Sequence, residues 1–171
     1  MDETGMPLDH KPPKLVVPKG TKKVHCRTSG NKAQITILAC GNAAGYVIPP
    51  MVIFEGKRLN PEWTKGEVPD TLYGMSEKGW TDMELFHYWM TNLFIPNIPP
   101  ARPVLLLLDG HFPHYKPDTI PIARDEGIMI LCLPPHTTHV SQPLDVSFFV
   151  LSRPTGLMLA INTCRIIQDV W

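Results

Sequence analysis

Two short aliphatic runs, each followed by polar residues, constrain what this chain can fold into more than any other feature. They are Val104–Leu108 and residues 128–133, and the first leads directly into Asp109. Neither run alternates apolar with polar side chains, and such runs are typical of strands buried on both faces. We therefore expect Val104–Leu108 to be a central, fully buried strand. In open α/β sheets the carboxyl ends of strands bind ligands and metals, so Asp109 is a candidate functional residue.

The first half of the chain has the pattern of an antiparallel meander. Strands are expected over residues 1–6, 34–40 and 46–54. Pro49-Pro50 interrupts the third of them, which favours an edge position or a bulge. Residues 56–78 are polar and rich in glycine and proline, so we expect a loop there.

The second half of the chain alternates predicted helices with the two aliphatic strands. Thr81-Asp82-Met83-Glu84 has the spacing of a capping box and predicts a helix that Pro96 ends. A short helix is expected over residues 117–126, stopped by Gly127. A last helix is expected to open at Gln142-Pro143, because proline is tolerated in a first helical turn.

Four short phrases place acids and histidines in a particular order along the chain. They are Asp2-Glu3-Thr4-Gly5, Leu108-Asp109-Gly110-His111, Leu133-Pro134-Pro135-His136-Thr137-Thr138-His139 and Gln142-Pro143-Leu144-Asp145. Over residues 1–150 they resemble the DDE superfamily endonuclease domain, and more narrowly its pogo/Tigger/jerky branch, a transposase-derived group that includes centromere protein B. The resemblance implies an α/β, ribonuclease H-like fold with a mixed five-stranded sheet flanked by helices. Because the resemblance begins inside the first acidic phrase, the first strand is expected to be clipped.

Three acids match the catalytic carboxylates of that family, namely Asp2, Asp109 and Asp145. The resemblance implies that they bind two Mg²⁺ or Mn²⁺ ions, which suit hard carboxylate oxygens and catalyse phosphodiester chemistry as a pair about 4 Å apart. We expect the three carboxylates to converge within roughly 10 Å, the span of a two-metal site with its ligands. A plainer interpretation exists for Asp145, as a first-turn helix acid, and for Asp2, as a frayed terminus.

Two pairs of histidines, each with a spacing of three residues, suggest a different metal site. His111 and His114, together with His136 and His139, could bind Zn²⁺. Both pairs fall within or beside the phrases that carry the resemblance. We therefore favour a supporting role for His111 and His139, orienting the acids or contacting phosphates.

Positive charge is concentrated in one stretch of a chain whose formal net charge is +0. Residues 10–54 contain seven basic residues and no acidic one. Among them Lys19, Lys22, Lys23 and Arg27 are the candidate DNA-binding residues. A patch of this kind binds phosphates in a salt-dependent way, although a solvated loop is an equally good interpretation.

The chain is expected to comprise an N-terminally truncated DDE-type catalytic domain at residues 1–153 and a divergent tail at 154–171. The resemblance implies DNA as a partner and a nuclear location. A homo-oligomer is one alternative for an oligomeric state that the sequence leaves open. No apolar run approaches the roughly 20 residues of a membrane span. Two functions compete: a metal-dependent endonuclease or strand-transfer enzyme, and a domesticated module that binds DNA or protein without catalysis. Because Asp2 lies on a short first strand, catalysis by this chain is expected to be weak or absent.

Overall fold

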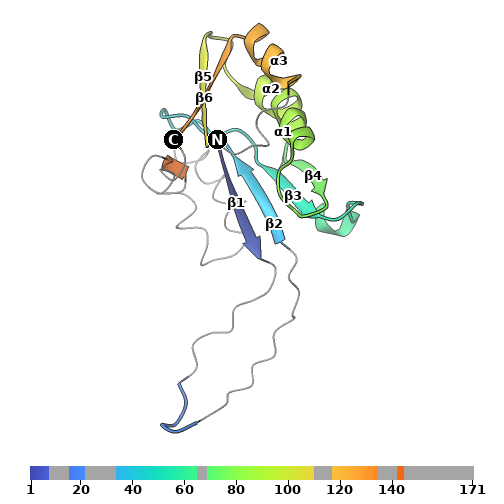
Figure 1. The fold of residues 1–171 in the computed structure, drawn as a ribbon, viewed down its shortest axis with the longest axis vertical. Coiled ribbons are helices and arrows are strands. Elements are labelled where there is room, and N and C mark those ends of the chain that lie inside the picture. Colours follow the sequence, from blue (N-terminus) through green and yellow to red (C-terminus); the bar gives the residue numbers. More distant parts are fainter. Residues whose placement is uncertain (8–15, 22–33, 65–68, 110–116, 135–141, 145–171) are drawn as a thin grey trace.

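The computed structural model describes residues 1–7, 16–21, 34–64, 69–109, 117–134 and 142–144. Its largest element is a four-stranded sheet in the order β1-β2-β3-β4 (Figure 1). The strands are β1 (Asp2–Pro7), β2 (Gln34–Ala39), β3 (Met51–Glu55) and β4 (Leu72–Ser76). The first three pair antiparallel, with Asp2 opposite Ala39 and Ile35 opposite Phe54. The predicted meander is thus confirmed, with a third strand shorter than expected.

The fourth strand, β4, shows that the loop predicted over residues 56–78 is wrong. A 3-10 helix, η1 (Pro61–Thr64), and β4 both lie in this region, and β4 pairs parallel to β3. A Cβ atom at Gly74 would come within 2.6 Å of Met51 Cε and 2.8 Å of Leu85 Cδ2. The glycine that suggested a loop therefore lets the sheet and the following helix approach each other closely.

The two aliphatic runs form a separate two-stranded parallel sheet of β5 (Val104–Leu108) and β6 (Ile128–Cys132). The α/β class is confirmed, but the expected single sheet of five strands is divided into sheets of four and two. The division falls between β1 and β5, where no strand ladder joins the two sheets within the described residues.

A nearly continuous helical segment connects the two sheets. It consists of α1 (Met83–Trp89), a π-helical turn η2 (Met90–Phe94) and α2 (Ile95–Asn97). Asp82, not Thr81, caps it, because the Asp82 carboxylate accepts a hydrogen bond of 2.9 Å from Leu85 N. The segment continues one residue beyond Pro96, which ends it less abruptly than predicted. The short helix α3 (Thr119–Asp125) lies where it was expected, and Gly127 follows it with a φ of 67°.

One hydrophobic core joins both sheets to the helices. Phe86, Trp89 and Met90 of the helical segment pack with Met51 of β3 and Leu108 of β5 in a single cluster. In Figure 1 the helices lie on one side of the β5–β6 pair.

The opposite side of β5 is open, so the expectation of a strand buried on both faces is wrong for the residues described. Leu106 and Leu108 are 3% and 0% exposed, whereas Leu105 and Leu107 are 53% and 40% exposed. Successive side chains of a strand point to opposite faces, and the helices cover one of these faces. An aliphatic run without alternation cannot reveal that its two faces have different surroundings.

Candidate active site

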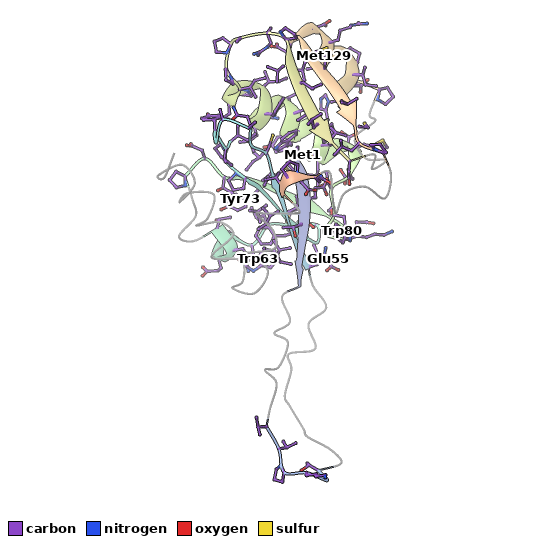
Figure 2. The ribbon with its side chains drawn as sticks, turned by 90° about the vertical axis from the view of Figure 1, so that its left-hand side faces the viewer. Met1, Glu55, Trp63, Tyr73, Trp80 and Met129 are labelled. Atoms are coloured by element: carbon purple, nitrogen blue, oxygen red, sulfur yellow. The ribbon has the colours of Figure 1, made fainter. Side chains whose placement is uncertain are left out.

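The two sheets meet at the first residue of the chain. The amino group of Met1 donates a hydrogen bond of 2.8 Å to the carbonyl oxygen of Leu107. Met1 also belongs to the same core cluster as Leu108, and Figure 2 shows it between the end of the β5–β6 pair and the start of β1. This contact continues the arrangement of strands from β1 across to β5.

The contact bears on the expected closeness of Asp2 and Asp109. Strands β1 and β5 run in the same direction (Figure 1). In a parallel pair, the residue whose N–H reaches the carbonyl of Leu107 lies beside the next residue, Leu108, so Met1 is a neighbour of Leu108. Asp2 and Asp109 are the next residue in each case, but no strand pairing between β1 and β5 extends to them within the described residues.

Asp2 is held rigidly on one face of β1. Its side chain is buried, with the residue 5% exposed, and its Oδ1 accepts a hydrogen bond of 2.8 Å from Glu3 N. Glu3 pairs with Leu38, which belongs to the helix-side core, so Glu3 lies on the opposite face from Asp2. Because side chains alternate between the two faces of β1, Asp2 and Glu3 lie in different environments although they are adjacent in the sequence.

A third part of the chain also reaches the junction. Gln142 is buried, and its Nε2 donates a hydrogen bond of 3.3 Å to the carbonyl oxygen of Met1. This contact holds the start of the Gln142-Pro143-Leu144-Asp145 phrase beside the first strand. Gln142 was not predicted to have a role of its own, and its place in that phrase was the only available signal.

The remaining predicted site residues lie largely outside the described residues. This applies to Asp145, to all four histidines considered for Zn²⁺, and to Lys22, Lys23 and Arg27. Lys19 is described and exposed. Within the described ranges no group of three metal-ligating side chains is found. The convergence of the three acids, including that of Asp2 with Asp109, therefore stays a prediction.

The donor set at the junction fits a hard divalent cation. The carboxylates of Asp2 and Asp109 offer the oxygen ligands that Mg²⁺ and Mn²⁺ prefer. Asp2 is buried. Buried charged groups in proteins are usually paired with an opposite charge or bind a metal.

A mixed α/β fold in which an antiparallel meander is followed by helices and a parallel strand pair is consistent with a ribonuclease H-like domain. The chain belongs to the DDE superfamily endonucleases, whose family model matches residues 32–151. No solved structure matches the chain significantly.

Three curated relatives extend this assignment. The mouse (Mus musculus) Jerky protein is 28% identical over 126 residues, and the human (Homo sapiens) Jerky protein homolog is 27% identical over 126 residues. Each match covers 67% of this chain and 22% of the relative. They agree with the transposase-derived branch suggested by the acidic phrases.

A protein of Cochliobolus lunatus named MFS-type transporter clz9 is 32% identical over 122 residues, which are 70% of this chain and 13% of that protein. The chain thus spans less than a quarter of the length of each of these relatives. Among the described residues no helix is long and apolar enough to cross a membrane.

Proposed function

We propose that this domain binds DNA and cleaves or transfers phosphodiester bonds with two Mg²⁺ or Mn²⁺ ions held by Asp2, Asp109 and Asp145. The hydrogen bond from Met1 to Leu107 carries the proposal, because it joins the start of β1 to the end of β5, the two places in the chain where Asp2 and Asp109 lie. When bound, the ions would activate the attacking oxygen and stabilise charge on the leaving oxygen. The protein would contribute the placement of the ligands on rigid strands.

The anchoring of the first strand favours an ordered Asp2. All six residues of β1 pair with β2, and both backbone groups of Met1 that flank the site are hydrogen-bonded, to Leu107 and Gln142. The frayed terminus expected from sequence is therefore not supported, and with it the main physical reason to expect weak catalysis is removed.

Asp145 would complete the site from the phrase that Gln142 anchors. Asp145 comes three positions after Gln142, which contacts Met1. Three residue steps span at most about 10 Å, and this short connection supports the proposal that Asp145 joins Asp2 and Asp109. His111 follows Asp109 by two residues, and we propose that it and His139 orient the acids or contact phosphate.

The substrate and the location are proposed from the family. Domains of the DDE superfamily suggest DNA as the partner, and the Jerky relatives suggest a nuclear protein. Lys19, Lys22, Lys23 and Arg27 would contact the phosphates, and self-association would be compatible with processing of two DNA ends.

The test compares metal-dependent stability and DNA nicking in the unmodified chain and two variants. Asp109→Asn removes one proposed ligand, while Asp125→Asn makes the same change at an exposed acid of α3, 3.8 Å from Arg124. At a Mn²⁺ concentration 100 times its dissociation constant, the unmodified chain and Asp125→Asn should gain about 2.7 kcal/mol in unfolding free energy. Asp109→Asn should lose this gain. Its nicking rate on supercoiled DNA should fall about 100-fold or more, since even outer partners of metal sites contribute about 10–100-fold.

The two readouts separate the competing functions. Metal stabilisation without nicking would mean that the acids bind a cation in a domain that does not cleave DNA. DNA binding with neither metal stabilisation nor nicking would favour the domesticated binding module.

A further inference from the structure

The side-chain amide of Gln142 is buried at the junction of the two sheets, and its two ends have different surroundings. Gln142 is 3% exposed. Its Nε2 donates to the carbonyl oxygen of Met1, which identifies the other end of the amide as the oxygen Oε1. Among the residues that the structure describes, none donates a hydrogen bond to Oε1. Buried polar atoms in proteins are almost always paired, so a buried amide oxygen of this kind calls for a ligand.

The amide lies at the edge of β1 that faces β5. Within a strand, the N–H and C=O groups of one residue point to the same side, and the nitrogen of Met1 points to Leu107 of β5. The carbonyl of Met1, to which Gln142 donates, therefore also points toward β5. In a continuing parallel ladder, this carbonyl would pair with the N–H of Asp109. The amide of Gln142 is thus placed at the boundary between the two strands, next to the peptide group that joins Met1 to Asp2.

Gln142 and the side chain of Asp2 reach this boundary from the same side. Glu3 lies on the helix side of β1, so Asp2 points away from the helices. Residues 142–144, drawn in orange-red, also lie on the side of β1 opposite α1 (Figure 1). Figure 2 views the molecule from that side and shows them in front of the strand, close to Met1. A buried amide oxygen and a buried carboxylate therefore share one side of the boundary.

The chemistry of these two groups suits a hydrated divalent cation. Mg²⁺ keeps several of its waters when it binds to protein carboxylates. A water bound to a cation is polarised by the ion and is a strong hydrogen-bond donor toward the protein. An amide oxygen accepts such a bond without adding negative charge beside Asp2. Binding of the hydrated ion would therefore also satisfy the buried Oε1 of Gln142.

We propose that Gln142 is a positioning residue for a divalent cation bound at Asp2. Its Nε2 holds the amide on the carbonyl of Met1, and its Oε1 accepts a hydrogen bond from a water molecule of that cation. This inference rests on the proposed function, because the cation is the one that Asp2 and Asp109 would bind. In the competing interpretation Gln142 is structural, and its contact with Met1 only anchors the start of β1.

An NMR titration of the unmodified chain tests the role of the oxygen directly. The sequence contains three glutamines, Gln34, Gln142 and Gln168, so isotope labelling of glutamine gives few side-chain signals to assign. Addition of Mg²⁺ should shift the amide carbon and nitrogen signals of Gln142, because a new hydrogen bond to Oε1 polarises the amide. Gln34 lies opposite Pro7, at the other end of the β1–β2 pair, and its signals should stay in place.

Calorimetry on the same sample separates this inference from the proposed function. Mg²⁺ binding that leaves the amide signals of Gln142 unmoved would overturn the inference alone. If the unmodified chain binds neither Mg²⁺ nor Mn²⁺, the proposed function and the inference both fail.

Two variants distinguish the oxygen of Gln142 from its contact with Met1. Gln142→Met removes both ends of the amide at a similar length, whereas Gln142→Glu keeps an acceptor oxygen and loses the Nε2 donor. The affinity for Mn²⁺ should fall about 10–100-fold in Gln142→Met, as is usual when an outer partner of a metal site is lost. It should not fall in Gln142→Glu. Equal losses in the two variants would mean that only the contact with Met1 matters, and would overturn the proposal.

Gln34→Met is the matched control, because it makes the same change at a glutamine of β2 far from the acids, and it should leave the Mn²⁺ affinity unchanged. Urea denaturation without metal shows whether each variant is folded. If Gln142→Met does not unfold cooperatively, Gln142→Glu and the amide signals of the unmodified chain decide the question. A loss of Mn²⁺ affinity in a folded Gln142→Glu protein would then overturn the proposal.

Discussion

At the scale of single residues, burial near the junction of the two sheets changes the pKa of a cysteine thiol. Cys40 follows β2 and belongs to the core cluster. Burial raises the pKa of its thiol above the ordinary value of 9.0, and the nearby amino terminus of Met1 acts in the opposite, lowering direction. The thiol therefore resists ionisation in the folded protein more than it does in the unfolded chain.

This shift predicts a loss of stability in alkali. Below the unfolded pKa both states hold the Cys40 proton, so the contribution of the thiol is constant. As the pH rises above about 8.5, the unfolded thiol ionises first and the unfolding free energy falls. Urea denaturation from about pH 7.5 to about pH 10, a range that brackets this value, should show a steeper decline for the unmodified chain than for Cys40→Ala. Parallel declines in the two proteins would contradict the predicted shift.

The acids illustrate how far single residues can be predicted from sequence. Asp109 was predicted from its position after an aliphatic run, which is a physical signal. Asp2 was predicted only from its phrase, because nothing in its local pattern distinguishes it from Glu3. The contact that joins their strands is one hydrogen bond, between Met1 and Leu107, and contacts over such a separation in sequence leave no local pattern.

At the scale of elements, the helical segment from α1 to α2 is the main support of both sheets. Its aromatic residues pack against one another, with 5.7 Å between the ring centres of Phe86 and Trp89 and 5.0 Å between Trp89 and Phe94. Trp89 is fully buried, whereas its neighbour Tyr88 is exposed. The sequence predicted this helix from its periodicity, but it missed β4, because an edge strand with one partner needs little apolar character.

Trp89→Ala should therefore destabilise the protein by about 3–5 kcal/mol, the usual cost of a large aromatic cavity in a core. Tyr88→Ala, one residue earlier in α1, should cost less than about 1 kcal/mol, since surface substitutions are usually small. Chemical denaturation followed by circular dichroism measures both values. A similar loss in the two variants would mean that α1 does not pack as described.

At the scale of the whole molecule, the basic stretch between β1 and β2 is the candidate contact with DNA. Replacing Lys19, Lys22 and Lys23 together by Gln should weaken DNA binding equally on unrelated sequences, because phosphate contacts carry no sequence information. The slope of log K against log salt should become shallower by about 0.9 for each phosphate that the variant no longer neutralises. Fluorescence anisotropy at several salt concentrations measures this slope. An unchanged slope would place the DNA-binding surface elsewhere.

The α/β class and, apart from β4 and η1, the order of the described elements could be predicted at this scale, but the division of the sheet could not. Each strand of the meander and each aliphatic run was visible locally. Whether β1 and β5 form a strand ladder depends on the length over which the two strands lie side by side. The pattern of residues within either strand does not contain that information. The exposure of Leu105 and Leu107 was missed because an aliphatic run without alternation does not reveal what covers each of its faces.

The core cluster has a consequence for how the molecule unfolds. The backbone ladder is interrupted between β1 and β5 in the described part of the chain, yet Met1, Met51 and Leu108 share one apolar cluster with the helical segment. Cooperativity follows side-chain burial, which dominates folding free energy, more than the continuity of strand pairing. The two sheets should therefore melt in a single transition, and the interruption marks a boundary in hydrogen bonding that is not a boundary between folding units.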